Sequence, residues 1–424
     1  MNHLPFNFPE MAFVRQTLFM SDLHDVAGAV RSVLRAIPDR YHVNPGSTVA
    51  VAVGSRKIDG LDKVVYECLR FLEYRGFRPF IVPAMGSHGG GTAGGQKHVL
   101  STYGITEPAM GVPIVADMDV RCVANHDLGF NIYMSTVALA ADHIVLINRI
   151  KPHTKFKADI ESGLCKMMTV GLGKHRGAAE IHQQAVDHTF GIIESSTAIL
   201  LNKLNLLFGL ALLEDGCGKL AQVETLFPDN LILQEKALLK KAGAMMSRIP
   251  FDPVDILVVD HIGKDISGIG MDSNVTGRHR DLVGNTMAAP HVKRIFVRDL
   301  SAASDGNANG IGLADFTTRR LVERMDRGLT YVNSLAAISP EKAAIPVYFD
   351  TDRQCLDACA RTCGRPNPYE LRIVRIKNTS SLEYLQVSRT LEKETLACDH
   401  LSFVSPWQGL VFDDLDNLTE FSVS

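Results

Sequence analysis

Three short runs of β-branched and small apolar residues constrain the fold of this chain most strongly. They are STVAVAVGS (47–55), FRPFIVPA (77–84) and HIVLINRI (143–150). Apolar runs without polar alternation are typical of strands that are covered on both faces, as in a parallel sheet. The first two runs are each followed by a polar or glycine-rich loop and then by a segment with helical spacing of apolar residues. This order predicts an α/β fold with a mainly parallel sheet.

The chain has 424 residues. A single hydrophobic core rarely supports a chain of that length, so we expect two domains. Strand-like and helix-like segments alternate again after Pro250 and Pro253, which mark the expected boundary. We predict an N-terminal α/β domain over residues 1–250, a C-terminal α/β domain over residues 251–424, and an active-site cleft between them. Open α/β sheets bind ligands outside the carboxyl ends of their strands.

Composition excludes several classes of protein. The formal net charge is −3 and the basic residues are dispersed, which argues against nucleic-acid binding. The chain does not begin with a basic segment followed by an apolar one, and no apolar run approaches the ~18 residues of a membrane span. The eight cysteines form no CxxC pair, as expected for reduced thiols. We expect a cytoplasmic protein without a membrane span, and no sequence pattern indicates its oligomeric state.

A helix-spaced cysteine series lies in the second half of the chain. Cys355, Cys359 and Cys363 would share one helix face, which suits a metal site in principle. Free cysteine is nevertheless commonly buried, and we expect this face to belong to a core.

The loop after the first strand run, GSRKIDG, contains Arg56. At the carboxyl end of a buried strand, a planar guanidinium suits a carboxylate or a phosphate group. Pairing of Arg56 with the nearby Asp59 is the structural alternative.

The loop after the second run is PAMGSHGGGTAGGQ (83–96). Its small residues let backbone N–H groups approach an anion, and Ser87, Gly89 and Gly90 are the candidates for that contact. His88 has few bulky neighbours that could bury it. Catalysis or metal ligation by His88 therefore competes with a solvent-exposed or capping role.

The stretch from Ile150 to His182 concentrates histidine, lysine and glycine after the third strand run. His153 follows the strand end, behind Pro152, which restricts the backbone. Lys166 has apolar neighbours in ESGLCKMM, where desolvation would favour a neutral amine that can act as a nucleophile or attachment point. The alternative is a helix lysine with its head in water. His182, at the expected start of the next helix, is a candidate metal ligand, although a lone histidine more often lies in a core or on a surface.

Together these motifs resemble the lactate racemase family, whose members use a nickel-pincer nucleotide. The resemblance is carried by GSRKIDG, PAMGSHGGGTAGGQ, NRIKPHTKF, IESGLCKMM and GLGKHRGAAEIH, over roughly residues 50–185. It is closer to the uncharacterised branch of the family than to the lactate-specific enzymes.

The resemblance implies a role for each candidate. Lys166 would hold the nucleotide covalently, through a thioamide, and His182 would ligate the nickel. His88 and His153 would be the acid–base pair on opposite faces of the substrate. Arg56 would contact substrate or cofactor.

The implied activity is that of an isomerase, a racemase or epimerase that inverts the C2 centre of a 2-hydroxy acid by hydride transfer to the tethered nucleotide. Two bases of like type suit this reaction because both enantiomers must react. Protein produced without the cofactor pathway is expected to lack the nucleotide.

The sequence departs from the family where substrate contacts are expected. GKDISGIGMDSNVTGRHR (263–280) occupies the corresponding region of the second domain, and Lys264, Asp272, Asn274 and Arg278 are the candidate substrate residues.

Two other classes of function remain open at this stage. The same histidines would also serve a zinc-dependent hydrolase or lyase without an organic cofactor. The glycine-rich loop would also serve a non-catalytic protein that binds a small anion or nucleotide.

Overall fold

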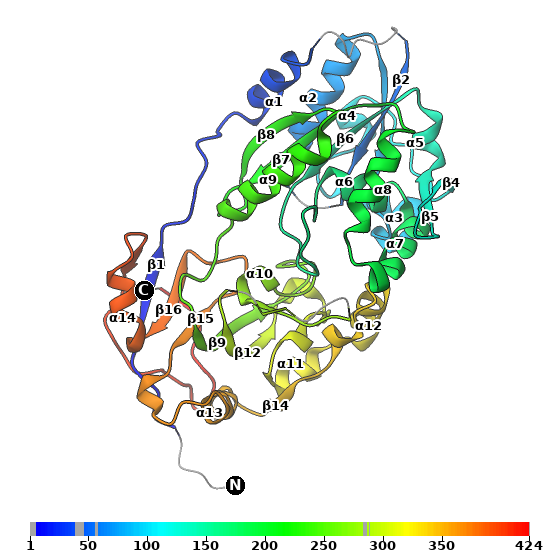
Figure 1. The fold of residues 1–424 in the computed structure, drawn as a ribbon. Coiled ribbons are helices and arrows are strands. Elements are labelled where there is room, and N and C mark those ends of the chain that lie inside the picture. Colours follow the sequence, from blue (N-terminus) through cyan, green and yellow to red (C-terminus); the bar gives the residue numbers. More distant parts are fainter. Residues whose placement is uncertain (1–5, 39–45, 56–57, 283–285, 288, 424) are drawn as a thin grey trace. The chain divides into compact units, whose positions relative to one another are not determined.

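The computed structural model describes residues 6–38, 46–55, 58–282, 286–287 and 289–423 (Figure 1). The chain forms two compact units, one of Met1–Leu18 with Ser247–Ser424 and one of Phe19–Met246. Each unit has helices and a mainly parallel sheet, which confirms the predicted α/β class. Within the described ranges, every helix falls short of the combined length and apolarity that a membrane span requires.

The sheet of the unit Phe19–Met246 has the strand order β3-β2-β6-β7-β8. The strands are β2 (Thr48–Val53), β3 (Arg78–Pro83), β6 (His143–Arg149), β7 (Leu206–Glu214) and β8 (Leu220–Leu226). The first four pair in parallel, and β8 returns antiparallel to β7. The three apolar runs of the sequence are thus β2, β3 and β6, buried at the centre and one side of this sheet.

Helices cover both faces of this sheet (Figure 1). On one face, α1 (Val26–Arg35) and α2 (Leu61–Tyr74) share a core with alternate residues of the strands. The buried side chains of α2 recur at helical spacing, which is why this segment forms an amphipathic helix. On the other face, Gly209 of β7 leaves the space that Leu164 fills, because a Cβ atom there would lie 2.5 Å from Leu164 Cδ1.

Further elements of this unit follow the same chain order. They are α3 (Ala93–Ser101), α4 (Glu107–Met110), β4 (Val120–Asn125), β5 (Asn131–Ser135), α5 (Thr136–Ala140), α8 (Ile192–Leu201) and α9 (Leu231–Met245). The strand-like segment between residues 106 and 138 forms an antiparallel pair of strands, β4 and β5, separate from the main sheet.

The histidine- and glycine-rich segment is more helical than its composition suggests. It contains the short helix α6 (Leu164–Lys166), the short π-helix η3 (Met167–Gly171) and the helix α7 (Lys174–His188). His182 therefore lies within α7 and not at the start of a helix, which corrects the sequence-based placement. Glycine in this segment suggests loops, but Gly171 is needed for close packing. A Cβ atom there would lie 2.6 Å from the carbonyl oxygen of Ala84.

The second unit has an eight-stranded sheet in the order β14-β13-β12-β9-β15-β16-β1-β17. The strands are β1 (Met11–Gln16), β9 (Val254–Ile262), β12 (Val292–Leu300), β13 (Phe316–Thr318), β14 (Val347–Phe349), β15 (Ile373–Ile376), β16 (Tyr384–Ser388) and β17 (Leu401–Phe403). Pairing is parallel from β14 to β15 and antiparallel from there to β17.

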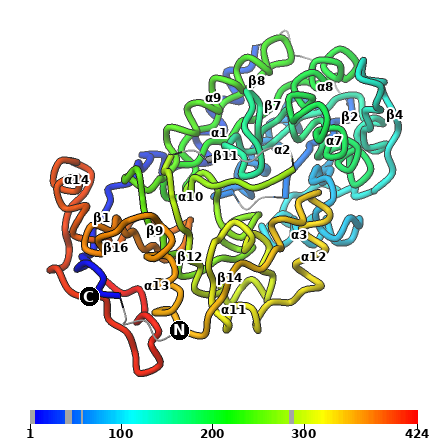
Figure 2. The backbone as a smooth tube through the Cα atoms, turned by 60° about the horizontal axis from the view of Figure 1, so that its bottom comes forward, coloured from blue at the N-terminus to red at the C-terminus, as the bar shows by residue number. Residues whose placement is uncertain are grey.

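Strand β1 departs from the predicted domain assignment. The sequence placed residues 1–18 in the N-terminal domain, but β1 pairs with β16 and β17, and Figure 2 shows it among the orange and red segments of the carboxyl-terminal region. Met11, Ala12 and Val14 are buried in this sheet. Residues Met11–Gln16 therefore complete the sheet of the second unit.

The remaining elements of this unit connect or cover its sheet. They are α10 (Ser273–Thr276), β10 (Arg278–His279), β11 (Thr286–Met287), α11 (Arg319–Arg324), α12 (Arg327–Ala336), α13 (Asp352–Thr362) and α14 (Glu392–Leu396). Cys355 and Cys359 of α13, and Cys363 directly after it, are buried with Ile256 and Val258 in one core. The expected core role of this cysteine face is confirmed.

Candidate functional site

The loops that follow β2, β3 and β6 meet at the carboxyl edge of the first sheet, where α/β folds hold their ligands. Gly54, after β2, is so close to its neighbours that a Cβ atom would lie 3.0 Å from Asn148 Oδ1 and 3.2 Å from Met167 Cε. Gly86, after β3, donates its N–H to the carbonyl oxygen of Gly171 at 3.1 Å. Arg56, predicted to bind substrate or cofactor, lies outside the described residues.

The glycine-rich loop forms a tight turn with the left-handed backbone that glycine permits. Gly89 and Gly90 have φ angles of 66° and begin the short 3-10 turn η2 (Gly89–Gly91). The adjoining Ser87 is half-buried, and His88 is exposed. The Nδ1 atom of His88 contacts the hydroxyl of Ser55, which follows β2. The structure thus brings His88 to the same sheet edge as the loop after β2.

A buried lysine holds this loop in place, and sequence reasoning did not single it out. Lys174 Nζ donates to the carbonyl oxygen of Pro83 at 2.6 Å and to Gln96 Oε1 at 3.2 Å. Gln96, also buried, donates to the carbonyl oxygen of Gly86 at 2.9 Å. Burial lowers the pKa of Lys174 to about 8, and the charge of Asp117 opposes that shift. Lys174 and Gln96 therefore join both ends of the glycine-rich loop to α7.

His153 and Lys166 are in direct contact. The Nε2 atom of His153 lies 2.6 Å from Lys166 Nζ. The main-chain N–H of Lys155 donates to His153 Nδ1 at 3.0 Å, so Nδ1 is an acceptor and the proton of the neutral ring belongs on Nε2. With the ring in this form, Nε2–H would donate to Nζ, and the amine would have to be neutral to accept. A charged ammonium would instead donate to an unprotonated Nε2.

An aromatic stack connects His153 with His182. The His153 ring stacks on Phe156 with 4.4 Å between centroids, and Phe156 stacks on Phe190 at 4.0 Å. His182 meets the other ring, Phe190, edge to face at 6.0 Å. Lys166 Nζ also lies 5.5 Å from the centroid of Phe156. The predicted tether, one predicted base and the predicted metal ligand thus surround a single pair of phenylalanine rings.

The main chain beside His153 is fixed by a buried acid. Glu161 accepts a hydrogen bond from the N–H of His153 and another, at 3.3 Å, from the N–H of Ala158. Burial raises the pKa of Glu161, although Lys157 and these hydrogen bonds act in the opposite direction. The position of the His153 ring is therefore set by its backbone as well as by its stacking.

Within the described part of the chain, no three His, Cys, Asp or Glu side chains come together as a metal-binding group. His182 is half-buried on α7, with Phe190 as its ring contact.

The predicted substrate residues lie in the second unit, in and after the loop that follows β9. Asp272 caps α10. Its side chain accepts hydrogen bonds from the main-chain N–H of Asn274 at 2.9 Å and from the side-chain amide of Asn274 at 2.8 Å. Lys264 Nζ donates to Asn333 Oδ1 at 2.8 Å. Lys264 is thereby joined to α12, and Asp272 and Asn274 are joined to each other.

Arg278 has a structural environment. It is 5% exposed, contacts the carboxylate of Asp315, and donates to the carbonyl oxygens of Val292 and Lys293 at 2.8 and 2.9 Å. A guanidinium whose donors are used in this way has little left for a ligand. We therefore assign Arg278 to the architecture of the unit.

Comparisons with known proteins find a fold relationship. No protein-family model matches the chain, and no curated protein matches it. Among solved structures, it is similar to a Thermotoga maritima protein, with a TM-score of 0.53 and 12% identity over 86% of this chain and 99% of that one. It is also similar to the lactate racemase apoprotein of Thermoanaerobacterium thermosaccharolyticum, with a TM-score of 0.51 and 12% identity over 80% of this chain and 82% of that one. At this identity the likeness shows a shared fold.

Proposed function

We propose that this protein is a racemase or epimerase of a 2-hydroxy acid that works with a nickel-pincer nucleotide attached to Lys166. The observation that carries the proposal is the contact between Lys166 Nζ and His153 Nε2, with His182 beyond the shared phenylalanine stack. The likeness to the fold of a lactate racemase supports it.

The residues fit such a cofactor chemically. Lys166 supplies an amine suited to an acyl linkage, and His182 supplies an imidazole suited to nickel. The N–H groups of Ser87, Gly89 and Gly90 would bind its phosphate, as backbone amides of small-residue turns do. Bound there, the nucleotide would provide a reversible acceptor for the hydride on C2 of the substrate.

The chain's own contribution to the reaction is proton transfer. In this proposal His88 and His153 exchange a proton with the C2 hydroxyl from opposite faces, one as base and the other as acid. Ser55 holds the His88 ring by its Nδ1 atom, and Lys155 holds the His153 ring in the same way. Nε2 is therefore the ring atom of each histidine that would exchange the proton. As a base, His153 would need its own proton on Nδ1, so the contact of Nδ1 with the Lys155 N–H would have to open. The roles of the two histidines would reverse with the enantiomer.

The substrate carboxylate requires a cation. Arg56 is the first candidate, because a guanidinium binds a carboxylate in two-point geometry. Lys264, Asp272 and Asn274 stay candidates from the sequence alone. A fixed carboxylate would orient the C2 centre between the two bases.

The proposal is tested with protein produced together with the cofactor-making enzymes. A panel of single-enantiomer 2-hydroxy acids is incubated with it, and the products are separated on a chiral column. We expect interconversion of at least one acid, lost in His88→Ala and His153→Ala. A hydrolase or lyase activity that depends on zinc and survives Lys166→Ala would contradict the proposal.

A further inference from the structure

A second buried acid, Glu235 on α9, contacts the turn that bears Lys166. It is 1% exposed, and its Oε2 atom accepts hydrogen bonds from the N–H groups of Leu164 at 2.8 Å and Cys165 at 3.0 Å. These are the first two N–H groups of α6, which no preceding helical turn can satisfy. Glu235 therefore caps this helix from a different element of the fold.

The approach of Glu235 depends on a glycine. A Cβ atom at Gly163 would lie 2.3 Å from Glu235 Oε1, so any larger residue would displace the carboxylate. The backbone of Gly163 itself, with φ of 178°, is one that other residues adopt freely. The glycine is needed here for space and not for its conformation.

The carboxylate of Glu235 occupies a costly position. Its Oε1 atom is buried and has no hydrogen-bond partner among the described residues. Burial raises the pKa of Glu235 to about 7, although the N–H group and the thiol of Cys165 and the N–H group of Leu164 oppose that shift. A leucine at this position would fill the core without the desolvation cost. Buried acids with perturbed ionisation often lie beside functional groups.

Other side chains fix the same short piece of backbone. Asn148, at the end of β6, donates to the carbonyl oxygen of Gly163 at 2.8 Å. Thr169 and Thr197 donate to the carbonyl oxygen of Cys165 at 3.0 and 3.5 Å. The backbone from 163 to 165 is thus held on its N–H and carbonyl sides. Lys166 is the next residue, and its side chain leaves this fixed turn toward His153.

We infer that Glu235 is a positioning residue: it fixes the turn 163–165 so that the Lys166 amine meets His153 and is held in its neutral, reactive form. The inference deepens the proposed function and rests on it, because Lys166 is the proposed attachment point. Glu235 acts through Lys166 and touches no reacting group itself.

The test measures the reactivity of Lys166 in protein that carries no cofactor. Brief acetylation at about pH 8 is followed by peptide mass spectrometry, with the exposed Lys240 of α9 as internal reference. An ordinary lysine, with a pKa of ~10.4, is less than about 1% neutral at that pH, so a lysine held neutral reacts much faster. We expect Lys166 to react at least about tenfold faster than Lys240 in the unaltered protein.

Three variants separate positioning from other roles. Glu235→Leu removes the cap, and Gly163→Ala keeps the acid but displaces it; we expect both to lower the Lys166 to Lys240 ratio about tenfold, toward that of an ordinary lysine. Glu235→Gln retains an oxygen acceptor for both N–H groups, and we expect a ratio within about twofold of the original. Lys240→Gln, with Lys241 as reference, is the matched control on the same helix.

Several outcomes would overturn the inference. An unchanged ratio in folded Glu235→Leu or in Gly163→Ala would show that the turn does not need the acid. Equal loss in Glu235→Gln would show that charge, and not capping, matters. Should Glu235→Leu fail to fold, Gly163→Ala decides the outcome alone. A normal reactivity pattern in a protein that racemises no 2-hydroxy acid would instead refute the proposed function and leave Glu235 as a positioning residue.

Discussion

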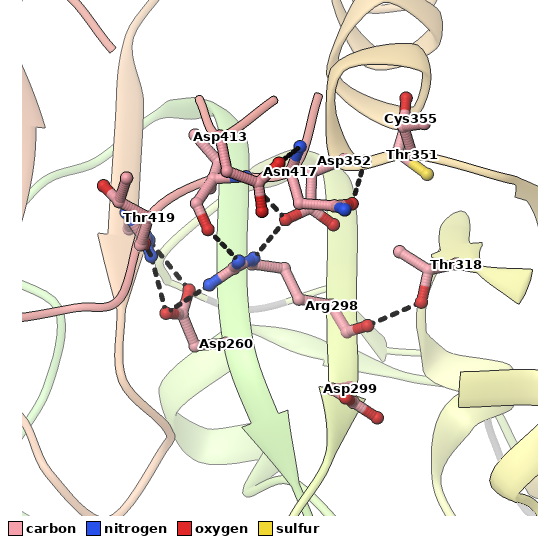
Figure 3. Close-up of polar contacts among 12 residues, drawn as sticks. Asp260, Arg298, Asp299, Thr318, Thr351, Asp352, Cys355, Asp413, Asn417 and Thr419 are labelled. Carbon is pink, nitrogen blue, oxygen red and sulfur yellow. Dashed lines mark hydrogen bonds and ion pairs between the residues drawn. The ribbon is translucent and has the colours of Figure 1, made fainter. Parts of the chain in front are cut away.

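Two groups of buried charges, one in each unit, are stabilised in different ways. In the unit that contains β9 and β12, Arg298 donates to Asp260 and to Asp352, each at 2.7 Å (Figure 3). In the unit Phe19–Met246, Glu235 and Lys174 make their hydrogen bonds to uncharged groups, namely backbone N–H, backbone carbonyl and a glutamine amide. One set of charges is neutralised by ion pairs, and the other is not.

The difference appears in the pKa values. Burial alone would lower the pKa of Arg298, but Asp260 and Asp352 raise it, so this arginine stays charged. Burial brings the pKa of Glu235 up to about 7 and that of Lys174 down to about 8, so both move toward their neutral forms. Paired buried charges maintain an architecture, whereas unpaired ones near a cluster of histidines indicate a functional site.

The largest effect is expected on activity, when Lys166 of the candidate site is replaced. Replacing it by alanine should abolish racemisation, with kcat/KM falling by at least ~1000-fold, or about 4 kcal/mol. The unfolding free energy should change by no more than about 0.5 kcal/mol, because Lys166 is only half-buried. Chiral analysis and urea unfolding measure the two effects. Retained activity in the variant would remove Lys166 from the site.

Arg298→Met should instead lower the unfolding free energy strongly. It leaves Asp260 and Asp352 buried with only their remaining arginine partners, Arg375 and Arg320. Breaking a buried ion pair costs about 3–5 kcal/mol, and the surviving partners favour the lower end of this range. Urea unfolding of the variant measures the loss. A loss well below 1 kcal/mol would show that the network contributes little stability.

Glu235→Gln should change how the unfolding free energy depends on pH. The pKa of Glu235 rises from its usual 4.5 to about 7 on folding, so the folded state binds the proton more tightly. The stabilising effect of this proton is complete below about pH 4.5 and is lost as pH rises to about 7, with a difference of about 3 kcal/mol. The glutamine variant does not titrate. It should gain stability relative to the unaltered protein between these pH values, and parallel pH profiles of the two would contradict this.

The smallest effect is expected one residue further along α9. Lys236 lies at the surface with 27% of its side chain exposed, and it pairs with Glu194 at 2.8 Å and Asp159 at 3.2 Å. Surface ion pairs contribute about 0–1 kcal/mol, so Lys236→Met should lower the unfolding free energy by no more than about 0.5 kcal/mol. This variant also controls for general damage to α9. A loss as large as that of Arg298→Met would show that exposed and buried pairs do not differ here.

Strands of the first sheet were predictable because their burial on both faces leaves a continuous apolar run in β2, β3 and β6. Strand β1 was placed in the wrong domain. Its sequence, MAFVRQ, contains no information about its partners β16 and β17, which lie near the other end of the chain. Local pattern predicts a strand but not the sheet that it joins.

The candidate site shows the same limit. His153 was expected at the sheet edge because it follows a strand end, and Lys166 was a candidate because its neighbours in the sequence are apolar. Glu235 could not be found this way: QEKALLKK reads as an amphipathic helix, in which Glu235 and Lys236 look alike as surface residues. Only the packing of α9 against α6 separates them. Arg278 illustrates the reverse case, since its pairing with Asp315 depends on a distant segment.

The central claim is that Lys166 is the attachment point of an active-site cofactor. It is tested most directly by intact-protein and peptide mass spectrometry, with nickel analysis, on protein produced together with the cofactor-making enzymes. A lactate racemase produced in the same way serves as positive control. The account predicts one adduct per chain on Lys166, with nickel, and loss of both in Lys166→Ala. An unmodified Lys166 without nickel, while the control enzyme is loaded, would contradict it.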